Sequence, residues 1–303
     1  MSNRKPTWRR VLGALGWILL LLAITVAVWR IFIFPWASQW GATRGERLKP
    51  LPGDEFGAPG APKRICGLTI EAPADEVWKW LVQIGQDRGG FYSYTFLENF
   101  VGAGIHNTNV IRPEWQELKV GDTIRLGRDE SVIRLEVLAV EPGRFLVLPS
   151  WGAFVLENAP DGRSCRFLIR SRGESKPLVR FALSLVLDPI HFLMQRRMML
   201  GIKELAEAKT AADRPLIPAF SDYAWFFSIL GAGLLILVTL FVRRRPGRLL
   251  TAACSSALLI LVLFRFPPAP IFGLALAFVI VLIFIWRVRP SLPPGPKTPV
   301  SAA

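Results

Sequence analysis

Apolar runs at both ends of the chain predict helices long enough to cross a membrane. Val11 to Trp29 is a run of 19 residues without a charge, about 28 Å long as a helix and close to the roughly 30 Å of a hydrocarbon core. We therefore expect an N-terminal membrane anchor within residues 1–34. Further apolar runs predict about three C-terminal membrane helices within residues 223–286, the last two being either full spans or a shallow hairpin: 223–242, 249–266 and 267–286.

Between these runs the hydrophobic pattern predicts a mixed α and β domain over residues 64–210. Arg64 to Glu71 alternates as a strand, and Pro73 to Ile84 has the spacing of an amphipathic helix. Thr95, with Glu98 three residues later, predicts a capping box that starts a short second helix. From Asp122 onward, apolar and polar residues alternate. This alternation predicts an antiparallel meander of strands near 122–126, 132–140, 145–149, 151–158 and 164–172.

One more helix is predicted at 189–209. Its apolar stripe includes Met194 and Met198, and we expect this stripe to cover one face of the sheet. Arginines alternate with apolar residues in the last strand, so we expect the other face to be wet. On the helix itself, the following side chains are expected on or near the wetter side: Gln195, Arg196, Arg197 and Lys203.

The remaining segments are expected to connect these parts. Residues 35–63 contain a Gly/Pro-rich stretch and predict an irregular linker. Trp36 and Trp40 stand where an interfacial aromatic belt is expected. Residues 211–222 form a second linker, and residues 287–303 a Pro-rich cytoplasmic tail.

The stretch 83–112 interleaves aromatic rings with uncharged hydrogen-bonding groups. Such rings can line a cavity while nearby amides orient a ligand in it. An ordinary helix-to-sheet junction with amide-capped turns is the structural alternative. The ligand-binding candidates from this stretch and the last helix are Gln83, Phe91, Tyr92, Tyr94, Phe96, Phe100, His106, Asn107, Met194 and Met198.

Charge and composition place the chain in a membrane and exclude a nucleic-acid partner. The mean hydropathy is +0.36 and the net charge is +14, but residues 35–222 carry 24 basic and all 23 acidic residues, a net of +1. Most of the remaining basic residues lie before the first apolar run, at 243–248 between the second and third runs, and after the fourth. By the positive-inside rule these three regions are cytoplasmic. We expect an integral protein of a bacterial inner membrane with its soluble domain outside the cytoplasm.

Acid/base chemistry has few candidates in the sequence. His106 and His191 are the only histidines, and His106 with Tyr92, Tyr94 or Glu98 could form a general acid/base pair. The three cysteines lack any metal-ligand spacing, so we expect no metal site and no cofactor. Cys66 and Cys165 are expected to be small core residues of strands.

Several motifs resemble the SRPBCC superfamily, which includes START lipid-transfer domains and polyketide cyclase/dehydrase-like proteins. LTIEAPADEVW at residues 68–78 resembles its opening strand-to-helix signature. A bacterial membrane-anchored subgroup is similar in WGAT at 40–43, GGFYSY at 89–94, HN at 106–107, LKVGD at 118–122 and MQRRMMLGIKELAE at 194–207. The resemblance implies a helix-grip fold, a curved sheet around a long C-terminal helix with an apolar cavity between them. It implies no reaction, and no catalytic residue carries over.

These observations favour a membrane-anchored domain that binds or transfers a hydrophobic, lipid-like small molecule. The alternative is a cyclase- or dehydratase-like enzyme that uses acid/base residues in the same cavity. A third hypothesis is a membrane scaffold whose cavity is filled by its own side chains. No feature of the sequence specifies a protein partner.

The predicted topology can be tested with single cysteines at Gly127 and Gly247 in a background that lacks the native three. An impermeant thiol reagent added to intact cells should label the Gly127 site and leave the Gly247 site unlabelled, because the basic flanks stay in the cytoplasm. Equal protection of both sites would contradict an extracytoplasmic domain.

Overall fold

The computed structural model describes residues 8–56, 63–127, 133–172, 178–241 and 246–265, together with residues 278 and 282. The chain divides into two compact units. One unit is Thr25–Tyr223, which contains the mixed α and β domain. The other consists of Met1–Ile24 and Ala224–Ala303, which contain most of the apolar helices.

The N-terminal apolar helix continues without a break into the domain. α1 (Trp8–Val28) is followed by a π-helical turn, η1 (Trp29–Ile33), and by α2 (Phe34–Ala37). Within these elements, the stretch Ile18–Ala37 is long and apolar enough to cross a membrane, by length and composition. The stretch thus reaches further toward the domain than the predicted run, which ended at Trp29.

Two C-terminal helices follow the domain. They are α7 (Phe220–Phe241) and α8 (Pro246–Arg265). Within α8 the apolar part is the shorter stretch Cys254–Arg265. The predicted run 267–286 and the tail 287–303 lie outside the described residues, apart from positions 278 and 282.

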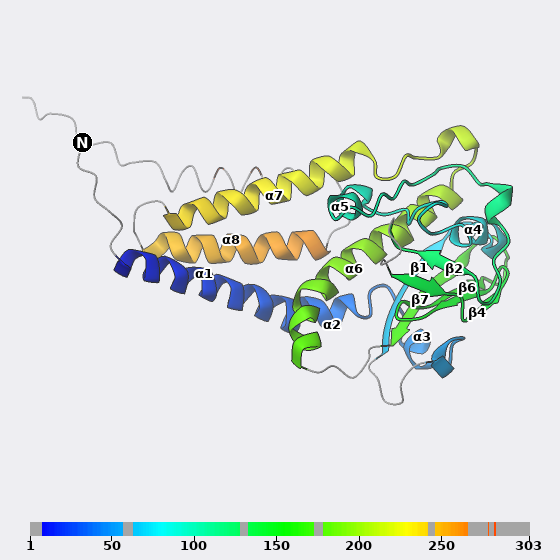
Figure 1. Ribbon diagram of the computed structural model, residues 1–303, viewed down its shortest axis with the longest axis horizontal. Coiled ribbons are helices and arrows are strands. Elements are labelled where there is room, and N and C mark those ends of the chain that lie inside the picture. Colours follow the sequence, from blue (N-terminus) through cyan, green and yellow to red (C-terminus); the bar gives the residue numbers. More distant parts are fainter. Residues whose placement is uncertain are drawn as a thin grey trace, which may run out of the picture. The chain divides into compact units, whose positions relative to one another are not determined.

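The domain is built on an antiparallel sheet, which confirms the α+β class (Figure 1). Its strands lie in the order β1-β7-β6-β5-β4, and β2 and β3 form a separate pair. The predicted strand 132–140 is split, because the chain changes partner between β3 and β4 where Leu138 N–H donates to Val147 O. The strands are β1 (Lys63–Ile70), β2 (Thr123–Arg125), β3 (Arg134–Glu136), β4 (Ala139–Glu141), β5 (Phe145–Leu148), β6 (Gly152–Asn158) and β7 (Cys165–Arg172).

Short helices lie before, between and after the strands. α4 (Ala74–Leu81) lies within the predicted helix 73–84, and α5 (Thr95–Phe100) is the predicted second helix. The expected capping box at Thr95 is wrong, because Thr95 is the first helical residue and the preceding Tyr94 makes no side-chain cap. The other short helices are α3 (Arg44–Leu48), η2 (Asp54–Phe56), η3 (Pro113–Trp115) and η4 (Ala211–Asp213).

The long helix α6 (Leu178–Ala206) packs against α4 and β1. It begins well before the predicted start and includes Pro189 in its interior. Proline removes one helical N–H bond and usually ends a helix on its N-terminal side. Here another element supports the helical turn before Pro189, because Asp188 accepts two hydrogen bonds from Arg64 on β1, at 3.1 and 3.0 Å.

The polar side of α6 is buried, contrary to expectation. Gln195, Arg196 and Arg197 are all buried instead of lying on a wetter side. Arg197 donates to Asp222 at 2.9 Å and to Glu204 at 3.2 Å. Burial alone would lower the pKa of Arg197, but these two carboxylates raise it above its ordinary value. Paired charge can be buried where unpaired charge cannot.

The second face of the sheet is also covered, so the prediction of a wet face is wrong. Arg166 and Arg170 project from β7 beneath α3 and the segment that follows it. Arg170 donates to the carbonyl of Lys49 at 2.7 Å and to Asp54 at 3.0 Å. Apolar residues from both sides form a core beside these arginines: Leu51, Ile65, Val147, Ala153, Val155 and Leu168.

Residues 35–56 therefore pack on the domain, which differs from the expected linker. Ile65 N–H donates to Ser38 O and Gly67 N–H to Trp40 O, each at 2.9 Å, so residues 38–40 lie along the free edge of β1. The predicted interfacial Trp36 and Trp40 pack on Phe192 of α6 instead, with ring centroids 5.5 and 6.4 Å apart. Glu46 in α3 forms a capping box with Thr43.

Glu46 should stabilise the domain strongly at neutral pH. Its carboxylate accepts from Arg166 at 2.8 and 3.0 Å. Burial alone would raise the pKa of Glu46, but the Arg166 and Thr43 hydrogen bonds lower it to about 2. Because the folded pKa lies below the unfolded one, the stabilisation, about 1 to 2 kcal/mol after solvent screening, is present above pH 4.5 and is lost as pH falls toward 2.

We expect Glu46→Gln to lower the thermal midpoint of the full-length protein in mild detergent at pH 7, followed by tryptophan fluorescence. The variant should also lose less stability than the wild type between pH 4.5 and 2. Glu114→Gln is the control, since Glu114 forms only an exposed pair with Arg112 at 4.0 Å. An equal drop in thermal midpoint for both variants would contradict the stabilising role of the Glu46 carboxylate.

Candidate functional site

Asn107 organises the aromatic stretch 83–112. Its Oδ1 accepts from the backbone N–H groups of Phe91 and Tyr92, at 3.0 and 2.8 Å. Its Nδ2 donates to Ser93 O at 3.0 Å and to Ile217 O at 2.8 Å. These four bonds use the full capacity of an amide side chain. Asn107 therefore fixes the loop and has no hydrogen-bonding group left for a ligand.

Gln83 and Tyr92 are also engaged with each other. Gln83 Nε2 donates to the Tyr92 hydroxyl at 2.7 Å and to Val110 O at 3.2 Å. Both side chains are fully buried, and Tyr92 has a left-handed backbone with φ of 51°. Burial raises the pKa of Tyr92 well above its ordinary value, so the phenol stays protonated.

The other residues of the predicted set do not converge. Phe91 and Tyr94 are buried, and Phe96 is half-buried with its ring 4.7 Å from that of Tyr223. Phe100 is 89% exposed and His106 is exposed as well. The structure therefore packs part of the predicted set into one layer, while Phe100 and His106 remain exposed.

α6 packs directly on this layer at the seam where a cavity was expected. Ser93 Oγ donates to Met194 O at 2.9 Å, and Met198 is buried. A Cβ added to Gly201 would lie 2.4 Å from Tyr92 O, so the helix and the loop touch through their backbones. Direct packing fills this part of the seam.

Glu98 is the most perturbed carboxyl group of the stretch. Its Oε2 atom is buried and has no hydrogen-bond partner among the described residues. Burial raises the pKa of Glu98 to about 7. A carboxyl group with such a pKa can exchange a proton near neutral pH. The candidate partner His106 is exposed, and Tyr92 is already bonded to Gln83.

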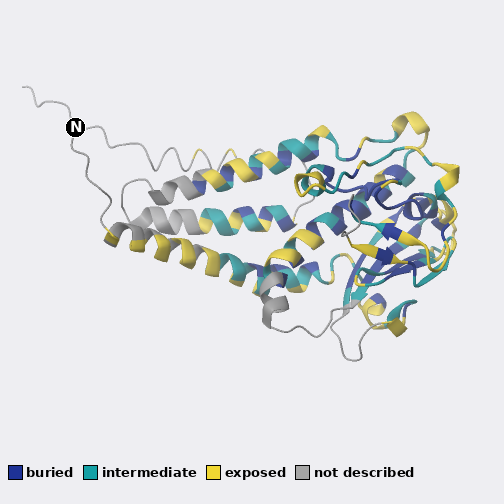
Figure 2. Ribbon diagram, viewed as in Figure 1, coloured by how far each residue is buried: buried dark blue, intermediate teal, exposed yellow. Residues whose placement is uncertain are grey.

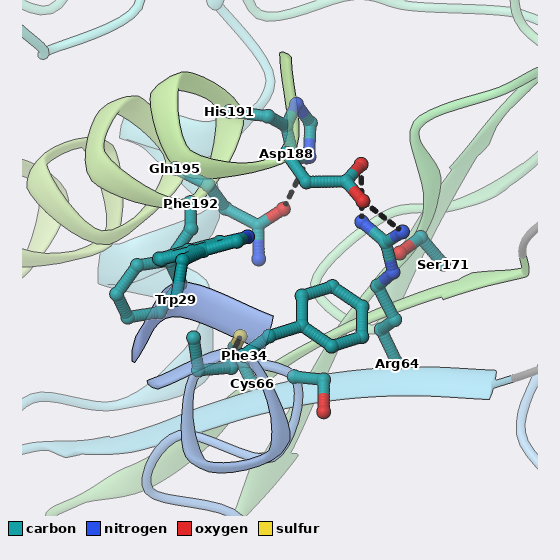
Figure 3. Close-up of a pocket in the computed structure, with 11 residues that line it drawn as sticks. Trp29, Phe34, Arg64, Cys66, Ser171, Asp188, His191, Phe192 and Gln195 are labelled. Carbon is teal, nitrogen blue, oxygen red and sulfur yellow. Dashed lines mark hydrogen bonds and ion pairs between the residues drawn. The ribbon is translucent and has the colours of Figure 1, made fainter. Parts of the chain in front are cut away.

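A pocket lies elsewhere in the same unit, where residues 29–38 meet β1, β7 and α6. Its volume is about 20 Å³, which is room for one water-sized group. Figure 3 shows aromatic rings on one side and an ion pair on the other. The lining residues are Trp29, Phe34, Ala37, Ser38, Arg64, Cys66, Ser171, Asp188, His191, Phe192 and Gln195.

Charge in this pocket is concentrated around Asp188. Arg64 donates to both carboxylate oxygens, and Arg30 lies 3.9 Å from one of them. The guanidinium carbons of Arg30 and Arg64 stand 4.6 and 5.0 Å from the centre of the Phe34 ring, within the range of cation–π attraction. His191 Nε2 lies 3.0 Å from Gln195 Oε1. Two cations therefore share one carboxylate, which leaves the group with a net positive charge.

Sequence reasoning missed this pocket, although one signal was present. Asp188 is the one acid in the mostly apolar run 181–192. An ionisable residue inside an apolar segment marks a functional site more often than chance. Its partner Arg64 lies on β1, far away in the sequence, and was read only as an alternating strand residue.

The described part of the chain contains no group of three or more His, Cys, Asp or Glu side chains able to hold a metal ion. Cys66 and Cys165 are buried free thiols, in agreement with their predicted role in the core. Burial raises the pKa of Cys66 to about 12, so its thiol stays protonated at neutral pH.

Among the solved structures that resemble part of this chain are two proteins of low sequence identity. No protein-family model matches the chain, and no curated protein matches it. A structural-genomics protein from Mesorhizobium loti is 16% identical, over 49% of this chain and 99% of its own, with a TM-score of 0.27. A Polyketide_cyc-like protein from Corynebacterium glutamicum is 17% identical, over 52% of this chain and 91% of its own, with a TM-score of 0.25. Both sequence identities and both TM-scores are too low for either structure to support a conclusion about this chain.

The raised pKa of Glu98 predicts that stability falls with rising pH. The folded protein holds this proton more tightly than the unfolded chain, so between pH 4.5 and about 7 the wild type should lose about 2 to 3 kcal/mol from this group. Glu98→Gln should remove that part of the decline in thermal midpoint between pH 5 and pH 8. Glu117→Gln, at a largely exposed carboxylate, should leave the decline unchanged. If the thermal midpoint of Glu98→Gln declined with pH as much as that of the wild type, the raised pKa of Glu98 would be contradicted.

Proposed function

We propose that this chain is a membrane-anchored protein whose α+β domain binds the anionic end of a lipid-like, amphiphilic molecule. The observation that carries the proposal is the pocket around Arg64 and Asp188, built partly from the apolar stretch Ile18–Ala37. The pocket thus combines cationic and aromatic groups with a helix that has the length and composition of a membrane span. Such a site suits a ligand with one charged end and one apolar end.

The strand order supports a helix-grip arrangement for the domain. β1 pairs with β7, and α6 packs against β1. Along the chain, a strand, two helices, antiparallel strands and a long helix follow one another, which is the element order expected from the resemblance to the SRPBCC superfamily. The pocket lies at one end of the α6 seam, away from Tyr92 and Gly201 where the seam is closed.

Recognition of an anion would use the Arg64 guanidinium. Arginine offers a planar fork that binds carboxylate and phosphate oxygens in pairs. At present this fork is satisfied by Asp188, while Arg30 approaches the same carboxylate at a longer distance. An anionic ligand would add a second acceptor to a group that carries two cations and one anion. Trp29, Phe34 and Phe192 supply the apolar wall.

The volume of the pocket limits what it can enclose. About 20 Å³ admits one small polar group and no acyl chain. The apolar part of the ligand must therefore remain outside, where Leu187 and Ile190, close to Asp188 in the chain, are exposed. Binding of this kind holds a lipid by its head group while its chains remain in the membrane.

The location of the domain follows from the charge pattern and is part of the proposal. Basic residues flank the apolar runs, and residues 35–222 are nearly neutral, which favours an extracytoplasmic domain at a bacterial inner membrane. The cyclase- or dehydratase-like alternative has less support, because His106 is exposed while Tyr92 and Tyr94 are buried.

The proposal predicts lipid retention that depends on Arg64. Full-length protein should be reconstituted with equal parts of phosphatidylglycerol and phosphatidylcholine, extracted in mild detergent, and analysed by native mass spectrometry. The wild type should keep one phosphatidylglycerol. Arg64→Gln should lower retention about tenfold or more, because a charge-assisted hydrogen bond contributes about 1.5 to 3 kcal/mol. Phe34→Leu should weaken retention less, through the lost aromatic face.

Arg125→Gln is the matched control, since Arg125 also pairs with a carboxylate, Asp87 at 3.1 Å, but outside the pocket. It should retain lipid as the wild type does. A thermal midpoint for each variant separates loss of binding from loss of fold. Wild-type protein without bound lipid would favour the scaffold hypothesis, and equal retention in Arg64→Gln and the wild type would remove the pocket from the proposal.

A further inference from the structure

We infer that the segment 184–190 of α6, which lies beside residues 29–37, rests in the surface of the lipid bilayer, so that the domain rests on the membrane. The inference rests on the proposed function, because it takes the stretch Ile18–Ala37 as the anchor. It adds an interaction surface that the anchor alone does not imply. An anchored domain could equally stand away from the bilayer on a linker.

In the segment 184–190 of α6 the polar side chains are buried and the apolar side chains are half-buried or exposed, and the exposed His191 follows directly. Ser184 and Asp188 are 4% and 8% exposed. By contrast, Val186 and Leu187 are 61% and 56% exposed, and Ile190, one turn further on, is 49% exposed and lies on the same side of the helix. A helix on the surface of a water-soluble domain has the opposite arrangement.

The N-terminal stretch continues the same pattern. Trp29, Ile33 and Ala37 follow at intervals of four residues and are each 3% exposed. Ile31 and Phe32, on the other side, are 64% and 69% exposed. These two residues lie inside the candidate span Ile18–Ala37. The exposed apolar surface of this helix is thus the surface that a span presents to lipid.

Contacts show that the two helices are neighbours within one compact unit. Arg30 lies 3.9 Å from Asp188, and the rings of Trp36 and Phe192 are 5.5 Å apart. The exposed apolar residues of both helices therefore belong to one region. Figure 2 shows exposed segments along α1 and on the part of α6 that follows its first turns. A contiguous apolar surface of this kind marks an interaction site.

A lipid bilayer is the occupant that fits this surface. The surface is continuous with a helix of spanning length, so any protein partner would have to bind at the level where that helix enters lipid. Arg30 and Arg64 lie on the inner side of the same region, next to Phe34. Cations at the edge of an apolar surface suit the anionic head-group layer. The pocket would then open at the depth of the lipid head groups.

The inference can be tested by the depth of single fluorescent labels in vesicles. Leu187→Cys reports on α6, Leu22→Cys on the anchor, and Val120→Cys on an exposed apolar residue of the domain that is remote from both helices in sequence. The exposed fractions of the three native side chains are similar, at 56%, 57% and 64%. The background carries Cys254→Ser, because Cys254 is exposed while Cys66 and Cys165 are buried.

Each full-length variant is labelled with an environment-sensitive dye and reconstituted in phosphatidylcholine vesicles, with or without lipids brominated along the acyl chain. We expect Leu187 and Leu22 labels to emit at short wavelength and to lose most of their fluorescence to the brominated lipid. The Val120 label should emit as in water and keep its fluorescence. These are the results of a domain that rests on the membrane through α6.

Other outcomes separate the two proposals. Quenching at Leu22 with a Leu187 label that behaves like the Val120 label would overturn this inference and leave the anchor in place. An unquenched Leu22 label would overturn the anchor, and with it both proposals. Equal quenching at Leu187 and Val120 would also overturn the inference, because contact with lipid would then not be specific to α6.

Discussion

Charge can be buried around α6 only where it is paired, and this constraint connects the distant parts of the domain. Asp188 is held by Arg64 of β1, and Arg197 is held by Asp222 at the start of α7. On the other face of the sheet Glu46 holds Arg166 in the same way. Removing one partner of a buried pair leaves an uncompensated buried charge. This destabilises a protein far more than replacing both partners with apolar residues. The pairs therefore fix which segments lie together, while apolar packing supplies most of the favourable free energy.

Periodicity predicted the secondary structure of the domain well. The strands near Phe145 and Trp151 and the helix at Pro73 appear within a few residues of their predicted limits, because alternation and helical spacing are local consequences of having one buried face. The α+β class follows from the same signals. The helix that begins at Leu178 was predicted to begin only at Pro189. Proline disfavours the helical conformation of the residue before it, and the contact that supports Asp188 comes from Arg64, far away in the sequence.

The sequence could not predict which polar residues face inward. Arg170 and Arg197 belong to polar stripes that normally face water, and their partners lie in other elements. The amides of the aromatic stretch were equally ambiguous: Asn107 has the composition of a ligand-binding residue, yet its four hydrogen bonds all go to backbone groups. A pocket built from Trp29, Arg64 and Asp188 depends on contacts between segments that are far apart in the chain, so residue spacing does not reveal it.

The pairing of β1 with β7 also has a consequence for the order in which the protein is made. Cys66 lies opposite Ile169, about a hundred residues later in the chain. During synthesis, the N-terminal helix and β1 leave the ribosome well before the strand and the helix that complete their surroundings. Long-range pairing of this kind is slow and leaves edges exposed in the meantime. Residues 38–40, which lie along the outer edge of β1, are already available at that stage and can cover that edge until the rest of the domain arrives.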